Sequence, residues 1–516
     1  MSPSPDRSPV GEAGRLTGRI RSTPSRLLHD EVLEPQFRYE AAYLLPWYTA
    51  VEKVFALEYR RMGLITASQA AEIGRLLHGA ARDGITADPQ ANMSDIAFAL
   101  EQYVERGLSE PVAAWHVDRS RNDMQSTAQL LFGRQLLLEG AESVMEFGLA
   151  AHRLATLTTD LPMVGQTHLQ AAQTITPGYY FAAVSQQMAH TLRRLLATHD
   201  GINLSPLGSG AMTGQDLPWD RDAMAALLGC RGPQPHALTG VASRAWVLEI
   251  AAEVSLLGSS LSRFVSDVMT WGSGPYGYLA LPDELSGISS AMPQKKNYPV
   301  LERIRGKSAH LSAYYLDMLL AQRATPFTNM VEVSKEAGAN LLPMFTTLGT
   351  TMRLFTAVVE NLGFDEDRMR SAVEQEFLGG FTLANQLTLR ESVPWRTAQV
   401  IAGRYILAAH AAGLPPHRIA PDLLRTAAAE HGITLADPET PLATAFRGAG
   451  ELYEKRSAGS AHPDRVRELL DEQGAEYRDL RAEWSARRER AEAGLGRIDA
   501  LLGLDGGAGG GRGAGA

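Results

Sequence analysis

The chain has 516 residues, with 49 Lys and Arg against 58 Asp and Glu, and its formal charge is −9. Hydrophobic residues make up 45% of the sequence, which is ordinary for a globular protein and excludes wholesale disorder. The acidic balance argues against a nucleic-acid-binding protein that works by bulk charge, and the single cysteine excludes a disulfide framework and a multi-thiolate metal site.

The two ends of the chain differ in composition from the rest. Residues 1–24 are rich in Pro, Ser, Gly and Arg, and we expect a disordered arm there, without the apolar segment of a secretory signal. Residues 503–516 are rich in Gly and are expected to form a disordered tail. No apolar run between them approaches the roughly 18 residues that a membrane span needs. The sequence therefore predicts a cytoplasmic protein that binds neither membranes nor nucleic acid.

The region between the ends is predicted to be all-α. Proline-poor helical stretches occupy about 119–157, 177–200, 300–322 and 331–361. The clearest helix runs over 245–271, where apolar side chains recur every three or four residues and so share one helix face. Its flanking positions are apolar too. More than one face is therefore expected to be buried, as in a central bundle helix or a helix at a subunit interface.

These patterns divide the chain into domains. We expect an N-terminal helical domain at 25–117, a central bundle of long helices at 118–362 and a C-terminal helical domain at 363–502. The central domain includes a loop at about 283–298, which we expect to be catalytic for the reasons given below. A charged tract at about 463–503 is predicted to be an amphipathic helix with a structural role only.

Polar clusters interrupt the helical pattern at three places that are far apart in the sequence. The first is Asp118–Asp123. Ser120, Arg121 and Asn122 would provide hydroxyl, guanidinium and amide donors beside a helix N-terminus, which suits a carboxylate. A solvated helix start with a capping side chain explains the same residues, so composition alone leaves both interpretations open.

The second cluster, Gly165–Gln170, places Thr167 and His168 just before a predicted helix. A lone His there is either structural or part of a polar pocket with the neighbouring Thr and Gln side chains. The third cluster, Ser286–Asn297, lies between two long apolar helices, where Pro293 fixes a turn ahead of two lysines and an amide. A mobile loop that brings a hydroxyl, an ammonium and an amide together is typical of segments that close over a substrate.

The third cluster resembles the GSSxMPxKxN signature of the fumarase/aspartase superfamily, and its MPQKKN resembles argininosuccinate lyases in particular. The first resembles their HTGRSRND segment and the second their GYTHLQxAQ segment. Pro206–Ala211 is similar to their PLGSGA turn, and Val393–Ala398 to their VPFREAH block. The resemblance spans roughly residues 30–475. The resemblance implies a three-domain all-α fold and a homotetramer with a twenty-helix core, in which three subunits share each active site.

The resemblance also implies a mechanism. Superfamily members eliminate fumarate from N- or O-substituted succinates without a metal or an organic cofactor. By motif matching, Ser289 would be the general base that removes the Cβ proton, and Lys295 would make the serine basic. Asn297 would bind the same carboxyl group. His168 would lie on the leaving-group side, oriented by Glu302 of another subunit, and the group that protonates the leaving nitrogen stays open.

The resemblance further implies the substrate-binding residues. Ser120, Arg121 and Asn122, together with Thr167, would hold the carboxylates of the substrate. Gln173, at the end of the second segment, would add to this binding site. By this resemblance all of these residues would serve the succinyl half of the substrate, and they match the family motifs in this sequence.

The residues that serve the arginine half of the substrate differ from those of argininosuccinate lyases. Ala97 stands where the EDIHxxxE stretch has His. In the segment matching TYNxDxQxDKE, Phe327 replaces Tyr and Glu332 replaces Gln, while Lys335 remains; all three are expected to bind substrate. Each polar partner lost would cost on the order of 1–3 kcal/mol.

We therefore expect cleavage of a different N-substituted aspartate, whose leaving amine is more apolar or differently charged. Trp47, Phe98 and Phe327 would line its pocket. The alternatives are a true argininosuccinate lyase with a drifted pocket, a hydrazino- or nitrosuccinate-type lyase, and a catalytically inactive structural homologue. A fumarase-type hydratase is disfavoured because MPQKKN and SRND belong to the carbon–nitrogen lyase branch.

Overall fold

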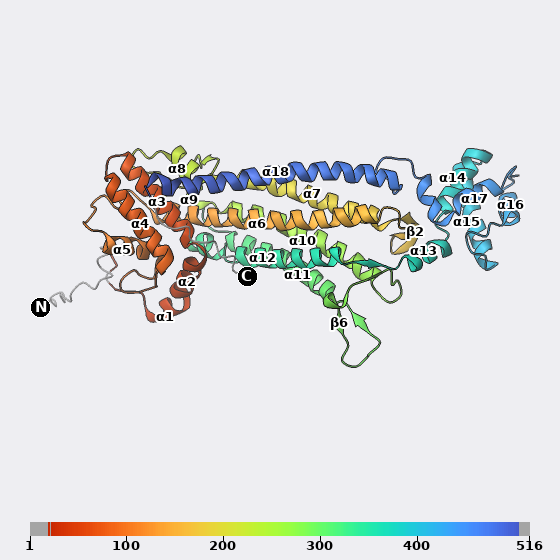
Figure 1. Ribbon diagram of the computed structural model, residues 1–516, viewed down its shortest axis with the longest axis horizontal. Helices are drawn as coiled ribbons and strands as arrows, with labels where there is room; N and C mark the ends of the chain where they lie inside the picture. The colour runs from red at the N-terminus through yellow and green to blue at the C-terminus, as the bar shows by residue number, and fades with distance from the viewer. Residues whose placement is uncertain (1–18, 21, 505–516) are drawn as a thin grey trace.

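The computed structural model describes residues 19–20 and 22–504. Most of the predicted arm at 1–24, and all but two residues of the predicted tail at 503–516, lie outside the described residues. The molecule is elongated, with a helical domain at each end of a bundle of long helices (Figure 1).

The N-terminal domain packs its helices around α3, whose Val51, Val54 and Phe55 are fully buried. The start of α4 is fixed by a capping box, in which Thr66 and Gln69 satisfy each other's backbone N–H groups. The domain comprises α1 (Arg26–Leu28), a π-helical turn η2 (His29–Leu33), α2 (Glu34–Tyr43), α3 (Leu45–Arg61), α4 (Ala67–Asp83) and α5 (Ile96–Gly107).

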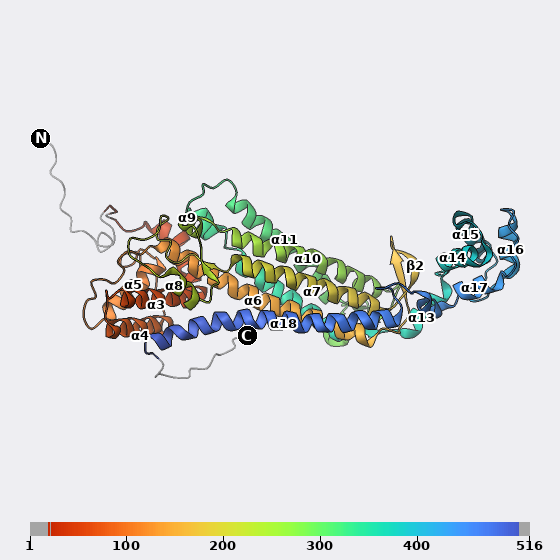
Figure 2. The same cartoon turned by 90° about the horizontal axis from the view of Figure 1, so that it is seen from above.

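Long helices form the central bundle and run nearly side by side (Figure 2). The helix predicted over 245–271 is α10, and it packs against α11 and α7 in the core. Within residues 22–504 it is the only helix long and apolar enough to cross a membrane. The bundle comprises α6 (Arg121–Leu157), α7 (Pro177–Ile202), α10 (Ala245–Trp271), α11 (Pro299–Gln322), α12 (Leu341–Glu360) and α18 (Pro463–Leu501).

The helix predicted over 331–361 is shorter than expected. Its first part is a π-helical turn, η4 (Glu332–Glu336), and α12 begins only at Leu341. Pro343 explains the late start, because proline lacks a backbone N–H and is tolerated in the first turn of a helix but not in its interior.

The expected boundary of 363–502 placed the last helix, α18, in the C-terminal domain. In the structure α18 lies outside that domain. Instead it runs back along α7 and α6 towards the N-terminal domain (Figure 1). Val466, Leu470, Tyr477 and Leu480 lie in the bundle core, and Ile498 reaches the N-terminal core. Buried side chains recur along α18 at the spacing of one helix face, so α18 covers the bundle with that face.

The C-terminal domain has a small core of its own, centred on Leu387, Ile401 and Tyr405. It comprises α13 (Glu366–Gln375), α14 (Gly380–Glu391), α15 (Trp395–Ala411), α16 (Pro421–Ala429), α17 (Glu439–Ala445) and a 3₁₀ segment η5 (Gly448–Glu454). Two short helices, α8 (Arg221–Leu227) and α9 (Ala237–Ala242), lie at the other end of the molecule (Figure 1).

The fold is mostly helical rather than all-α, because short strands pair into two-stranded sheets. The longest pair, β1 (Met163–Thr167) and β2 (Gln170–Ile175), is an antiparallel hairpin. The others are β3 (Leu204–Ser205) with β4 (Gly232–Pro233), β5 (Leu279–Ala280) with β8 (Gly363–Phe364), and β6 (Gly287–Ile288) with β7 (Lys296–Asn297); a 3₁₀ turn, η3 (Asp283–Leu285), precedes β6.

Candidate active site

The first polar cluster forms the N-terminus of α6. Ser120 is the N-cap, and its Oγ accepts a hydrogen bond of 3.2 Å from the backbone N–H of Asn122. Arg121 donates to Asp95 over 2.5 Å and lies 4.6 Å from the centre of the Phe98 ring. The amide of Asn122 donates to the Ala211 carbonyl over 3.0 Å. The side chains of Ser120, Arg121 and Asn122 are therefore gathered at one helix end.

Asp123 joins this cluster to the predicted Pro206–Ala211 turn. Its carboxylate is buried and accepts hydrogen bonds of 3.0 Å from the backbone N–H groups of both Gly208 and Gly210. Both glycines have positive φ, which brings their N–H groups towards one acceptor. Burial raises the pKa of Asp123 to about 7. The two motifs therefore form one unit, although sequence analysis gave Asp123 no role.

A buried ionic cluster supports the same helix start. Arg119 and Glu52 form a bidentate ion pair whose side chains are 2% and 0% exposed. Nη2 of Arg119 lies 2.9 Å from Nδ1 of His116, and that nitrogen lies 3.2 Å from Glu101. Burial, with the nearby charge of Glu105, raises the pKa of Glu101 to about 7. Sequence analysis missed this cluster because its members lie on separate elements.

Thr167 and His168 lie at the tip of the β1–β2 hairpin and are exposed. The prediction that His168 immediately precedes a helix is wrong, because β2 intervenes before α7. His168 and Leu169 form the two-residue turn with φ of 54° and 61°, as in the turns that match the twist of a hairpin. Gln173 pairs with Gly165 across the hairpin, further from the tip.

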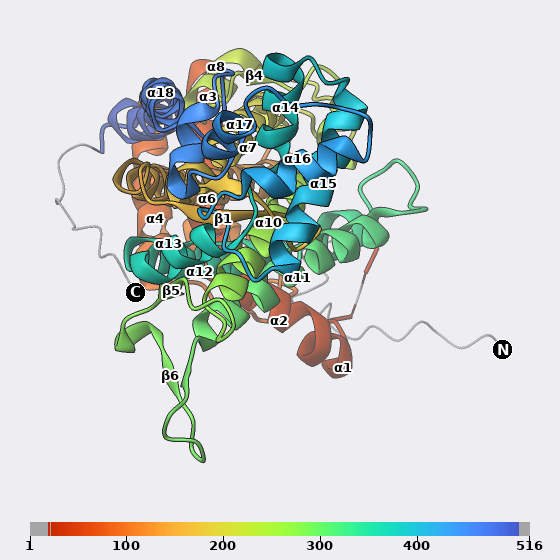
Figure 3. The same ribbon diagram turned by 90° about the vertical axis from the view of Figure 1, so that its right-hand side faces the viewer.

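The predicted catalytic loop is a second hairpin, β6–β7, which projects away from the bundle (Figure 3). Ser289 and Lys295 stand at the two ends of its loop, next to the last pair, Ile288 and Lys296. Ser289 Oγ accepts from the Met292 N–H over 3.1 Å. Asn297 follows on β7. Three predicted catalytic groups therefore share one hairpin, and Lys295 is exposed.

One chain does not bring the predicted groups together. Ser120 and the Thr167–His168 tip lie at opposite ends of α6, whose 37 residues span about 55 Å. The Ser289 hairpin projects from the bundle away from both ends (Figure 1). Glu302 is exposed in the first turn of α11. These groups lie far apart within one chain, so a complete site would need more than one chain.

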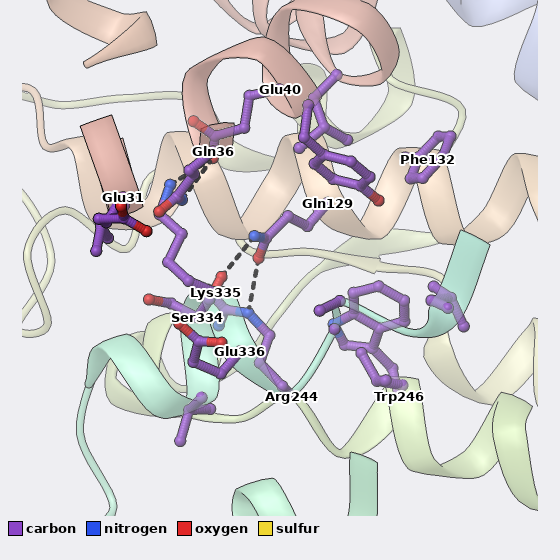
Figure 4. A pocket seen from close by; sticks show the side chains of 18 residues that line it. Glu31, Gln36, Glu40, Gln129, Phe132, Arg244, Trp246, Ser334, Lys335 and Glu336 are labelled. Atoms are coloured by element: carbon purple, nitrogen blue, oxygen red, sulfur yellow. Dashed lines mark hydrogen bonds and ion pairs between the residues drawn. The ribbon is translucent and has the colours of Figure 1, made fainter. Parts of the chain in front are cut away.

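A cavity of about 320 Å³ lies between the N-terminal domain, α6 and the start of α10 (Figure 4). Lys335 lines it and forms an ion pair with Glu40. Gln129 and Arg244 also line it, and sequence analysis found neither of them. Gln129 lies seven residues after Asn122 on the same face of α6, so helical periodicity was the missed signal. Arg244 precedes an apolar helix, and no pattern marks it.

The predicted leaving-amine pocket does not form as expected within one chain. Trp47, Phe98 and Phe327 are not among the residues that line the cavity. Phe98 lies under Arg121 instead, and Phe327 is 62% exposed. Glu332 is also exposed, so of the three residues predicted for the leaving half, only Lys335 lines the cavity. In residues 19–20 and 22–504, no group of His, Cys, Asp and Glu side chains is placed to hold a metal ion.

Comparisons with known proteins agree with the motifs. A family model described as Lyase matches residues 47–312. Argininosuccinate lyase 1 of Shouchella clausii is 29% identical over 76% of this chain and 79% of its own length. The argininosuccinate lyase of Aquifex aeolicus is 32% identical over 61% of this chain and 68% of its own length. That of Hyphomonas neptunium is 31% identical over 62% and 69%, respectively.

Solved structures show the same fold. A structure of EDDS lyase in complex with formate superposes with a TM-score of 0.82 at 24% identity, covering 97% of this chain and 98% of its own. A class II fumarase from Schistosoma mansoni superposes with a TM-score of 0.62 at 16% identity, covering 78% and 91%. The arrangement of the long bundle and its end domains is therefore that of fumarase/aspartase-type proteins.

Proposed function

Because this chain belongs to the lyase family that includes the argininosuccinate lyases, and is a carbon–nitrogen lyase, we propose that it eliminates fumarate from an N-substituted aspartate. The residues proposed for the reaction need neither a metal nor an organic cofactor. Relatives of the chain are named argininosuccinate lyases, which supports the proposal that a carbon–nitrogen bond is broken. We further propose that the protein acts in the cytoplasm.

One observation carries this proposal. Ser289, Lys295 and Asn297 occupy one hairpin that its own chain leaves exposed, while Thr167 and His168 occupy the exposed tip of another. Ser289 and Asn297 each make one hydrogen bond within the hairpin, whereas the exposed Lys295 forms no ion pair among the described residues. The same groups are useful when the loop closes over a substrate and excludes water.

The proposed chemistry starts with removal of a proton from the carbon next to the far carboxylate. Ser289, deprotonated beside the Lys295 ammonium, takes this proton, and the electron pair moves into the carboxyl group. Lys295 and Asn297 stabilise the resulting double negative charge. The carbon–nitrogen bond then breaks, the nitrogen leaves with a proton, and the double bond of fumarate forms. Thr167 helps to hold the carboxylates of the substrate, and His168 lies on the leaving-group side.

Other copies of the chain would complete the site. The α10 and α11 helices expose apolar side chains along the bundle, including Leu256 at 50%, Leu316 at 53% and Leu320 at 52%. Rows of exposed leucines on long helices favour burial against another copy. We therefore propose a homotetramer in which Ser120–Asn122, the Thr167–His168 tip and the Ser289 hairpin of different chains form each site, with Glu302 orienting His168.

We propose that the leaving amine is not arginine. Phe327 lacks the hydroxyl of the family Tyr, and Glu332 replaces a neutral Gln with a charge. Argininosuccinate is the second candidate, because the relatives carry that name. The test is to incubate the purified protein with argininosuccinate and a panel of N-alkyl- and N-carboxyalkylaspartates, and to follow fumarate in the ultraviolet. Release from some of the other aspartates, faster than from argininosuccinate, supports the proposal; no release from any of them refutes it.

A further inference from the structure

Arg244 is a buried cation that no carboxylate among residues 19–20 and 22–504 pairs with. Arg244 is the residue immediately before α10, and it is 2% exposed. Its Nε donates to the amide oxygen of Gln129 over 3.1 Å, and its Nη1 donates to the carbonyls of Val241 and Ser243 over 2.8 and 3.2 Å. All three acceptors are neutral. The remaining nitrogen, Nη2, is buried without any hydrogen-bond partner.

Such an arrangement is unusual, because buried arginines are normally paired with an acid. Burial lowers the pKa of Arg244 to about 10, so the guanidinium is still charged at neutral pH. Leaving a charged donor unpaired in the interior is more costly than leaving a neutral one. The guanidinium therefore has one donor available for an anion.

The cavity next to Arg244 is also lined by Lys335, whose charge Glu40 neutralises, and by two further carboxylates, Glu31 and Glu336 (Figure 4). Phe132, Trp246 and Leu341 form an apolar part of the wall. The cavity thus combines a hydrocarbon surface with charged side chains of both signs, among which Arg244 hydrogen-bonds only to neutral groups.

The cavity lies further along α6 than the proposed succinyl site. Gln129, which holds Arg244, lies seven residues beyond Asn122 on α6, which is about 10 Å along the same helix face. Between them, Gln125 is 8% exposed and its Nε2 has no hydrogen-bond partner. A substrate that extends about 10 Å along this face of α6 from Asn122 would therefore reach Gln129 at the cavity.

We infer that this cavity receives the leaving amine, and that Arg244 binds a carboxylate carried at the far end of that amine. The inference rests on the proposed elimination and names its substrate class: conjugates of aspartate with an amino acid or other amine that has an apolar body and a terminal carboxylate. Nη2 is shielded from solvent, so the carboxylate reaches it only when the cavity wall shifts. That wall includes the π-helical turn Glu332–Glu336, and irregular turns of this kind recur at functional sites.

The test compares two substrates of equal length, N-(carboxybutyl)aspartate and N-pentylaspartate. Arg244→Met removes the charge at similar volume, and Arg244→Lys keeps it. Arg75→Met, on the exposed face of α4, is the matched control. We expect Arg244→Met to lower kcat/KM for the carboxylated substrate roughly 10- to 100-fold, mainly through KM. N-pentylaspartate should be affected less than about twofold, and Arg244→Lys should recover part of the loss.

Equal losses for both substrates, or no loss for either, would overturn the inference, because Arg244 would then be structural or irrelevant. If Arg244→Met fails to fold, the wild-type protein still decides. Aminopentanoate, the carboxylated product amine, should then bind to it roughly tenfold more tightly than pentylamine by calorimetry, and equal affinities would refute the inference. If no aspartate derivative yields fumarate, the proposed function fails, while calorimetry still tests Arg244 separately.

Discussion

Glu451 of the C-terminal domain accepts a hydrogen bond of 3.0 Å from the hydroxyl of Thr174 on β2, and the two residues are 2% and 1% exposed. The other carboxylate oxygen accepts from Lys455 over 3.1 Å. Val164 of β1 packs against α13 of the same domain. The C-terminal domain therefore holds the base of the hairpin whose tip carries His168.

Thr174→Val tests this connection, because it removes the hydroxyl while keeping the volume. The buried carboxylate then loses a donor, which costs about 1–3 kcal/mol. We expect a lower thermal unfolding temperature and a several-fold lower kcat, since the hairpin is less well positioned. Thr174→Ser, which keeps the hydroxyl, is the control. Equal kcat values for the Val and Ser variants would show that the hydrogen bond does not position the hairpin.

Removing one partner of the buried Arg119–Glu52 pair is expected to lower the free energy of unfolding more than replacing both partners. Arg119→Met leaves the carboxylate buried and unpaired, so it should lower the free energy of unfolding by about 3–5 kcal/mol. The double variant with Glu52→Leu should lose much less, because no charge is left alone. Urea unfolding at fixed protein concentration measures both. A double variant that loses the sum of the single losses would contradict the pairing.

Glu101 predicts a pH dependence of stability with a definite sign. Its pKa is about 7 in the folded chain and 4.5 ordinarily, so its protonated form favours the folded state. That contribution is complete below about pH 4.5 and is lost as the pH rises through 7. Glu101→Gln should therefore gain on the order of 1–2 kcal/mol over wild type between those pH values, a figure reduced for partial exposure. Glu110→Gln, on an exposed loop, should show no such trend.

The choice of leaving amine is tested by restoring the family residues. Phe327→Tyr combined with Glu332→Gln should raise kcat/KM for argininosuccinate about tenfold or more, because each change returns a polar partner. The assay is fumarate release, and an exposed Glu110→Gln variant, remote from the cavity, serves as the control. Wild-type turnover of argininosuccinate that exceeds every other aspartate, with no effect of Phe327→Tyr, would mean that arginine is the true leaving group.

The long helices were predictable because a core helix keeps its periodicity whatever surrounds it. The predicted bounds of α10, 245–271, are confirmed, and the motif match to a carbon–nitrogen lyase is confirmed by the relatives. The β1–β2 hairpin was missed because its turn uses His168 and Leu169 at positive φ, positions where Asn and Gly are the usual signal.

Other features depend on contacts that no local pattern records. Placing α18 in the bundle requires knowing which core its apolar stripe covers, and sequence periodicity gives the stripe but not the partner. Arg244 is significant only because its neighbours are neutral and it borders a cavity, and both facts arise from residues distant in sequence. The sequence pattern of one chain likewise does not predict how several chains would share a site.

Mixing two variants tests most directly whether Ser289 acts at a site shared between chains. Ser289→Ala removes the proposed base, and His168→Asn alters the leaving-group side. Each protein should assemble normally but release almost no fumarate, while Ser290→Ala, next to the base, should keep most of the activity. Size-exclusion chromatography shows whether assembly is intact.

The two inactive proteins are then dissociated together in mild denaturant and reassociated. Some sites in the mixed assemblies combine an intact Ser289 from one chain with an intact His168 from another. We predict that fumarate release returns to a measurable fraction of the wild-type rate. A mixture that assembles but stays inactive, or a Ser289→Ala protein that still turns over substrate by itself, would contradict a shared site with Ser289 as its base.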